Sequence, residues 1–316
     1  MNWKENFVKW LFPLDANQMR IEAAFLLKLQ NLPKNLYKYR EVNEHSINNL
    51  KSNTIWLADP RTFNDPYDCS HFVDHMSLTD CLIRTLPQPL RNKLPSAIIE
   101  EFERRIADSS HSPYEVLLDV VFSAEPNTAV INDAKKSVLA AFDSVMQKNL
   151  DRTAEAMKGG FKVCSFSERN DSTLMWAHYA KYHTGFCIEY DISAVNPAEF
   201  TSRFMYPVIY KDTPFEATEN ISRVDMPGFN NLYLNLAALI KSVDWAYERE
   251  WRLIFANGTL ENEQTWRMPK PTAVYLGSHI SKENQSLLTT ICQKNFIPLF
   301  KMKHARSTFA MTPTKV

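Results

Sequence analysis

Hydrophobic and polar positions in the first part of the chain predict a strand, a helix and a second strand, followed by a polar turn. Residues 36–40 and 54–58 have the aromatic and β-branched composition of short strands. Residues 44–52 carry apolar side chains at helical spacing, and so do residues 16–30. The run at 63–68 predicts a tight turn, because Asn, Asp and Pro each favour one.

The middle of the chain has a different pattern, which is helical throughout. Helical spacing recurs at residues 97–106, 114–122 and 128–157. Prolines at positions 87, 89, 95, 113 and 126 separate these patterns, and Gly159 with Gly160 ends the last one. We therefore expect residues 78–158 to form a helical insertion.

Strand patterns return after the two glycines and alternate with helices to the end of the chain. Strands are expected at residues 161–167, 186–191, 204–210, 273–277 and 296–300, with one more after residue 301. Helices are expected at residues 174–182, 230–243 and 282–294. Pro207 places its strand at an edge or a bulge, because proline cannot donate to a sheet.

These patterns predict an α+β fold with a mixed, mostly antiparallel sheet and a helical insertion. The expected division is an N-terminal helical extension at 1–35, a core at 36–77 and 159–316, and the insertion at 78–158. The length of 316 residues suits one large domain or two modest ones.

Charged side chains concentrate at residues 245–255, where they alternate with aromatic and aliphatic ones in the order WAYEREWRLIF. This alternation is typical of a half-buried strand, in which successive side chains point to opposite faces. Glu248, Glu250 and Arg252 would then share one face, at intervals of about 7 Å. Such a face is typical of a site that holds carboxylates, but also of an edge strand that faces solvent.

A second cluster, polar and aromatic, lies between residues 165 and 183. On a helix, Trp176, Tyr179 and His183 would lie on one side, with His178 off that side. The cluster predicts a pocket wall that stacks a planar ring and offers a histidine as donor or acid/base; the alternative is an aromatic stripe packed in the core. Asn64 and Asp65, in the turn after a strand, would border such a pocket or only shape the turn.

Composition and the motifs that the sequence lacks argue against several function classes. Lys plus Arg equals Asp plus Glu at 36 each, which argues against a dedicated nucleic-acid binder. Five cysteines without a CxxC pair predict reduced thiols and a cytoplasmic protein. The chain has no apolar run long enough to span a membrane and no GxGxxG, P-loop or GxSxG motif. His71 and His75 have a spacing that holds a metal on a helix, but no HExxH accompanies them, and no metal is expected.

The chain resembles a bacterial family of unknown function, DUF2971. The motifs that carry this resemblance are 36–40 (LYKYR), 63–68 (FNDPYD), 164–167 (CSFS), 175–179 (MWAHY), 183–191 (HTGFCIEYD), 245–252 (WAYEREWR) and 274–277 (VYLG). They run in order over most of the chain, and the family name implies no activity.

A weaker resemblance is to the ADP-ribosyltransferase superfamily, whose members have a split sheet. Those enzymes begin with a strand that carries Arg or His, then a helix and a second strand, and a much later strand carries the catalytic Glu, often as Glu-x-Glu. Here Arg40, the helix near Ile47, the strand near Trp56 and Glu248-x-Glu250 follow that order. The Ser-Thr-Ser motif of the arginine-specific class is not evident.

This second resemblance implies NAD as cofactor and a role for several of the candidate residues. Glu250 would stabilise the oxocarbenium-like cation, and Glu248 would orient or activate the acceptor. The polar and aromatic cluster adds His178 as a candidate acid or base. Arg40 would hold the pyrophosphate. The other cofactor-binding candidates are Tyr39, Asn64, Asp65, Trp176, Tyr179 and Arg252.

The expected function is therefore that of a cytoplasmic NAD-dependent ADP-ribosyltransferase-like enzyme, as a toxin or anti-phage effector. Its acceptor would be a protein, a nucleic acid or water, and an oligomer or a protein partner is compatible with the sequence. Two alternatives stay open. One is a non-enzymatic nucleotide- or partner-binding module, and the other is a metal-dependent nuclease that uses Asp65, Asp68, His178 and Glu250.

Overall fold

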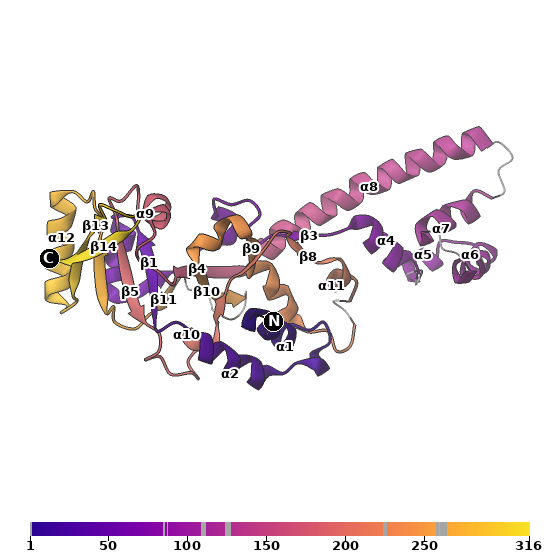
Figure 1. Cartoon of the computed structure of the whole chain (residues 1–316). Coiled ribbons are helices and arrows are strands. Elements are labelled where there is room, and N and C mark those ends of the chain that lie inside the picture. Colours follow the sequence, from indigo (N-terminus) through magenta and orange to yellow (C-terminus); the bar gives the residue numbers. More distant parts are fainter. Residues whose placement is uncertain are drawn as a thin grey trace.

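The computed structural model describes residues 2–84, 86, 88–108, 112–123, 128–223, 226–256, 259 and 264–316. The molecule is elongated, with the main sheet at one end and a helical arm at the other (Figure 1). The expected α+β fold with a mixed, mostly antiparallel sheet is confirmed. The prolines expected to separate helices at positions 87 and 126 lie outside the described residues.

The main sheet has eight strands, and all its neighbours are antiparallel except β12 and β13. Its order is β14 (Met311–Lys315), β13 (Leu299–His304), β12 (Ala273–Leu276), β5 (Phe186–Asp191), β1 (Asn35–Arg40), β4 (Phe161–Ser167), β10 (Glu250–Ala256) and β6 (Met205–Pro207). Pro207 lies in the edge strand β6, as its missing N–H predicts.

The sheet opens between β1 and β4. All six residues of β1 are in register with β5, and all seven residues of β4 are in register with β10. In contrast, β1 and β4 are in register at one pair only, Tyr37 with Ser167. The sheet is thus split into a five-stranded and a three-stranded part that meet at this pair.

Helices cover both faces of the sheet. One core lies under α3 (Glu44–Ser52) and α12 (Lys282–Lys294), which bury Ile47 and Leu288. On the other face, α9 (Thr173–Tyr179) packs Met175 and Trp176 against β1 and β5. The split in the sheet therefore lies beside α9.

The remaining elements of the core region are short. They are β2 (Thr54–Trp56), η2 (Pro60–Thr62), β3 (His71–Phe72), α10 (Phe200–Arg203), β7 (Ile209–Lys211), β8 (Phe215–Glu216), α11 (Thr218–Arg223), η3 (Asn231–Ala238), β9 (Ile240–Ser242), η4 (Val243–Glu248) and β11 (Thr265–Arg267). Three additional two-stranded pairings join β11 with β2, β3 with β8, and β7 with β9.

The N-terminal residues form two helices and a short 3-10 turn. These are α1 (Trp3–Leu11), η1 (Ala16–Gln18) and α2 (Ile21–Asn31). The helix expected at 16–30 is therefore confirmed from residue 21 onward, whereas residues 16–18 form a separate 3-10 turn. Asp15 caps the start of η1 through the N–H of Asn17, and η1 ends at its C-cap Met19, before α2 begins. Buried Phe7, Leu11 and Phe12 anchor this segment to the second core cluster.

The insertion consists of α4 (His75–Arg84), α5 (Gln88–Arg91), α6 (Ser96–Asp108), α7 (Pro113–Val121) and α8 (Thr128–Lys158). The 31-residue α8 leaves the sheet region as a single rod that α4 contacts, and α5 to α7 lie at the outer end of the arm (Figure 1). Phe102, Tyr114 and Leu117 belong to a hydrophobic cluster that lies entirely within the insertion. The insertion therefore has a core of its own.

Two expected elements near the C-terminal half are wrong. Residues 230–243 form the 3-10 segment η3 and the strand β9 instead of one helix. Residues 245–255 are not one strand, because η4 ends at Glu248 and Arg249 adopts a left-handed conformation with φ 45° before β10 begins. Nor is β10 an exposed edge, since it lies between β4 and β6.

Candidate functional site

Two adjoining cavities lie at the split of the sheet. The smaller, which we call the inner chamber, has a volume of about 170 Å³ and is lined by residues of β1, β4, α9, β9 and the 63–68 turn, together with Glu248 and Glu250. The larger, the outer pocket, has a volume of about 660 Å³, within the range of ligand sites in proteins. The two share Lys38, Tyr39 and Tyr179 in their linings.

The floor of the inner chamber is a buried cluster of charged side chains. Lys241 Nζ donates to Glu248 Oε2 at 2.6 Å and to Glu250 Oε2 at 3.1 Å. The Tyr179 hydroxyl donates to Glu248 Oε1 at 2.6 Å. The two glutamates expected to act together therefore meet at one lysine, with a tyrosine of the α9 wall beside them.

Arg252 joins the same cluster through Glu250 and Asp68. Its Nε donates to Glu250 Oε1 and its Nη2 to Glu250 Oε2, while Nη1 and Nη2 together bind both oxygens of Asp68 at 2.7 Å. Nη1 also donates to the carbonyl of Ala238 at 2.8 Å. These bonds occupy all five N–H donors of a guanidinium. Arg252 is 0% exposed, so its cofactor-binding role is replaced by a structural one.

The local fold explains why the two glutamates converge. Glu248 ends η4, and the left-handed Arg249 turns the chain so that Glu250 begins β10. The Ser167 hydroxyl donates to the Glu248 carbonyl at 2.6 Å, and the N–H of Glu250 donates to the Tyr210 hydroxyl at 2.8 Å. The backbone around both acids is thus held from β4 and from β7.

The two glutamates have opposite pKa shifts. Burial, and then the nearby charge of Glu250, raise the pKa of Glu248 to about 7. Burial alone would raise the pKa of Glu250 as well, but the charges of Arg252 and Lys241 outweigh it and hold that pKa well below its ordinary value. A pair of carboxyls with separated pKa values can divide into one proton-transferring group and one permanent anion.

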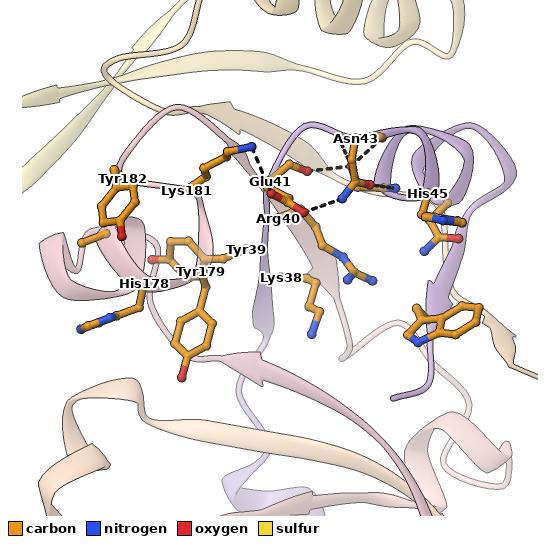
Figure 2. A pocket seen from close by; sticks show the side chains of 14 residues that line it. Lys38, Tyr39, Arg40, Glu41, Asn43, His45, His178, Tyr179, Lys181 and Tyr182 are labelled. Carbon is orange, nitrogen blue, oxygen red and sulfur yellow. Dashed lines mark hydrogen bonds and ion pairs between the residues drawn. The ribbon is translucent and has the colours of Figure 1, made fainter. Parts of the chain in front are cut away.

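The outer pocket is cationic and aromatic at its mouth. Lys38, Arg40 and Tyr179 extend toward the same open space (Figure 2). The Nη2 atom of Arg40 is buried without a hydrogen-bond partner, whereas the nearby Glu41 accepts from Asn43 and pairs with Lys181. An anionic group in this pocket would give the Arg40 guanidinium its missing partner.

The other predicted residues of the α9 region separate into core and pocket. Trp176 is fully buried, and its indole N–H donates to the carbonyl of Asn170. It therefore packs in the core, as the aromatic-stripe alternative predicted, and does not form a pocket wall. His178 lines the outer pocket and contacts the Trp245 ring edge-on. His183 does not continue the helical side, because α9 ends at Tyr179 and His183 is left-handed. Its ring lies against His279 and His304 instead.

The remaining candidates divide between the two cavities and a third. Tyr39 lines both cavities and donates from its hydroxyl to the carbonyl of Arg169. Asn64 lines the inner chamber. Asp65 lines a separate cavity of about 320 Å³ on the other side of Lys241, and its carboxylate accepts from the N–H of Tyr67 as in a turn.

Sequence reasoning missed Lys241 and the structural role of Asp68. Lys241 lies inside the segment that the sequence predicted as a helix. The one sequence signal that could have marked it as a site residue is that this lysine directly follows the apolar run 236–240. Asp68 lies 184 positions before its partner Arg252, and no local pattern joins them. No group of three or more His, Cys, Asp or Glu side chains in the described parts of the chain could hold a metal ion.

The fold and site define a mixed α+β protein with a cavity at a split sheet, floored by buried charges. Residues 175–253 match the model of a family described as a protein of unknown function, DUF2971. The match confirms the resemblance to that family over about a quarter of the chain, and it includes Tyr179, Lys241, Glu248, Glu250 and Arg252. No curated protein and no solved structure matches the chain. In the part of the chain that the structure describes, no helix is long and apolar enough to cross a membrane.

Proposed function

We propose that the protein is a cytoplasmic NAD-dependent ADP-ribosyltransferase-like enzyme. The observation that carries the proposal is the pairing of Glu248 and Glu250 at the floor of an aromatic chamber that opens into a cationic pocket. NAD has matching parts: a cationic nicotinamide ring joined to a ribose at one end, and an anionic diphosphate in the middle.

The two cavities suit these parts in size as well as charge. A cavity of about 150 Å³ holds a single six-membered ring, so the inner chamber of about 170 Å³ suits the nicotinamide ring. The outer pocket would take the diphosphate on Arg40 and Lys38. Exposed Trp56 and Tyr182 line this pocket and offer rings for the adenine.

The reaction would break the bond between the nicotinamide nitrogen and ribose C1′, with neutral nicotinamide as the leaving group. Positive charge develops on the ribose, and the ionised carboxylate of buried Glu250 would stabilise it. The acceptor oxygen or nitrogen would then bond to C1′. The proton that the acceptor loses would pass to Glu248, whose pKa of about 7 suits a group that exchanges protons near neutral pH.

The test is NAD consumption by purified protein, followed as released nicotinamide. We expect Glu250→Gln to lower the rate by about 100-fold or more, as the loss of one electrostatic contact to a developing charge does. Glu248→Gln should lower it at neutral pH and remove its dependence on pH. Glu199→Gln is the matched control, because Glu199 is exposed and its side chain makes no capping bond.

A Glu250→Gln protein that consumed NAD at the wild-type rate would remove Glu250 from the mechanism. Growth of cells that express the protein provides a second readout, since an effector that depletes NAD or modifies a host target is toxic. Toxicity that Glu250→Gln does not relieve would contradict the effector role.

One observation favours a second candidate, a nucleotide-binding module without catalysis. Lys241 donates to both glutamates, and such an ion-paired cluster can serve stability alone. Calorimetric binding of NAD without release of nicotinamide would support this candidate. The nuclease alternative gains no support, because its four residues are divided among three cavities: Asp68 and Glu250 line the inner chamber, His178 the outer pocket and Asp65 the third cavity.

A further inference from the structure

The cluster under the inner chamber contains one more acid than base. Asp68, Glu248 and Glu250 provide three carboxyls, whereas Lys241 and Arg252 provide two cations. Each of these side chains is at most 5% exposed. A net charge in so buried a place is costly, and these five ion-paired side chains are together neutral only when one carboxyl keeps its proton.

The hydrogen bonds identify Glu248 as the carboxyl that keeps the proton. Asp68 accepts two bonds from Arg252, and Glu250 accepts two from Arg252 and one from Lys241. Glu248 has no bond to Arg252 and contacts only Lys241 among the cations of the cluster. Its other oxygen is 2.6 Å from the neutral Tyr179 hydroxyl. Glu248 thus receives the least positive charge of the three acids.

Other titratable and charged groups surround Glu248 on every side. Lys38 of β1 lines the chamber, with its ammonium bonded to the Ser165 carbonyl at 2.7 Å. The groups that face Glu248 from packed elements are Lys38 of β1, Asp68 of the 63–68 turn, Tyr179 of α9, Tyr210 of β7, Lys241 of β9, Tyr247 of η4, and Glu250 and Arg252 of β10. Burial lowers the pKa of Lys38, and its ammonium is bonded to a backbone carbonyl.

We propose that the inner chamber binds a cationic head group, such as a quaternary ring nitrogen, and that binding displaces the proton of Glu248 to solvent. The balance is simple: protonated Glu248 plus the cation give ionised Glu248 paired with the cation, and one proton is released. No covalent bond forms or breaks in the ligand. The inference deepens the proposed function, since the nicotinamide ring of NAD is such a cation, but it requires no reaction.

The walls of the chamber favour a cation as well. Tyr37, Tyr39, Phe63, Phe166 and Tyr179 line it, and aromatic faces attract cations when water is excluded. The volume of about 170 Å³ admits one planar ring and excludes a larger group. A neutral ring of equal shape would fill the same space but would leave the proton on Glu248.

The probes are therefore 1-methylnicotinamide, a small aromatic cation, and nicotinamide, its uncharged counterpart. Titration calorimetry at pH 6, repeated in two buffers with different heats of protonation, measures the protons released on binding. We expect about one proton released for the cation and none for nicotinamide. The affinity for the cation should rise about tenfold per pH unit between pH 5 and 6.5 and level off above pH 8.

Glu248→Gln should bind the cation without proton release and with an affinity that no longer depends on pH. Glu199→Gln should behave as the wild type. Tryptophan fluorescence would show whether Glu248→Gln folds. If it does not, the pH dependence of cation affinity in the wild type is sufficient to test the inference. Failure of the cation to bind, binding without proton release, or a flat pH profile would each overturn the inference.

The same measurements separate this inference from the proposed function. A protein that binds 1-methylnicotinamide with proton release but never consumes NAD has the cation site without the enzyme. A protein that consumes NAD, yet binds the cation with no proton released, is the enzyme without the proton-linked site.

Discussion

Replacing Arg252 by methionine tests how much the buried charge cluster contributes to stability. Methionine keeps much of the volume but removes all five N–H donors, and it leaves Asp68 and Glu250 without their main partner. Removing one partner of a buried ion pair costs about 3–5 kcal/mol. With a urea m-value of about 3 kcal/mol/M for a chain of this size, the unfolding midpoint should fall by at least about 1 M.

The control is Arg61→Met, which removes an exposed ion pair. Arg61 and Asp59 are 52% and 37% exposed, and an exposed pair that solvent screens contributes little to stability. Tryptophan fluorescence is a suitable probe, because all seven tryptophans lie outside residues 78–158 and therefore do not report on the helical insertion. An Arg252→Met midpoint within 0.3 M of the control, taking ~0.3 M as about 1 kcal/mol, would refute this account of the cluster.

The pH dependence of this effect has a definite sign. The folded-state pKa of Glu250 lies below its unfolded value, so its contribution is present above the unfolded pKa of about 4.3 and is lost as pH falls. Arg252 is the first of the two cations that depress it. The difference in unfolding free energy between wild type and Arg252→Met should therefore be largest at neutral pH and shrink below about pH 4.3.

Two further substitutions test other parts of the fold. Burial lowers the folded-state pKa of Lys28 to about 7. The unfolded chain therefore binds more protons between pH 7 and 9, and the free energy of unfolding of the wild type should rise there, on the order of 1 kcal/mol per pH unit. Urea unfolding of Lys28→Met at both pH values should lack this rise, and an equal rise in the variant and the wild type would contradict the explanation. Gly277→Ala would place a Cβ atom 2.1 Å from the carbonyl oxygen of His183, so a loss of about 3 kcal/mol or more is expected by urea unfolding. Gly159→Ala meets only the flexible Arg61 side chain and should change little; equal losses for the two alanine variants would remove the steric explanation.

The sequence predicts best those elements whose ends carry their own signals. The helix expected at 44–52 matches α3, because Asn43 and Ser46 form a reciprocal capping box at its start. The helix at 282–294 matches α12, which Ser281 caps. The strands at 161–167 and 186–191 match β4 and β5, whose inward side chains belong to the buried core.

The errors fall where tertiary contacts decide the local structure. The segment before Lys241 is rich in Leu and Ala, which favour a helix, but Ile240 and its neighbours pair in parallel with β7. The strand expected at 245–255 fails at Arg249, whose left-handed conformation no residue pattern announces. The paired position of Glu248 and Glu250 survives this error, because both carboxylates reach Lys241 from the two sides of the turn.

The split in the sheet explains why the polar side chains gather where they do. Where β1 and β4 part, backbone groups lose their sheet partners, and buried backbone groups need others. Side chains replace them: Lys38 donates to the Ser165 carbonyl, and Ser167 accepts from the Arg169 N–H while it donates to the Glu248 carbonyl. A closed sheet at this position would need none of these groups. The opening therefore requires polar residues on both of its edges, and those residues bring the Glu248 segment to the floor of the cavity that the opening creates.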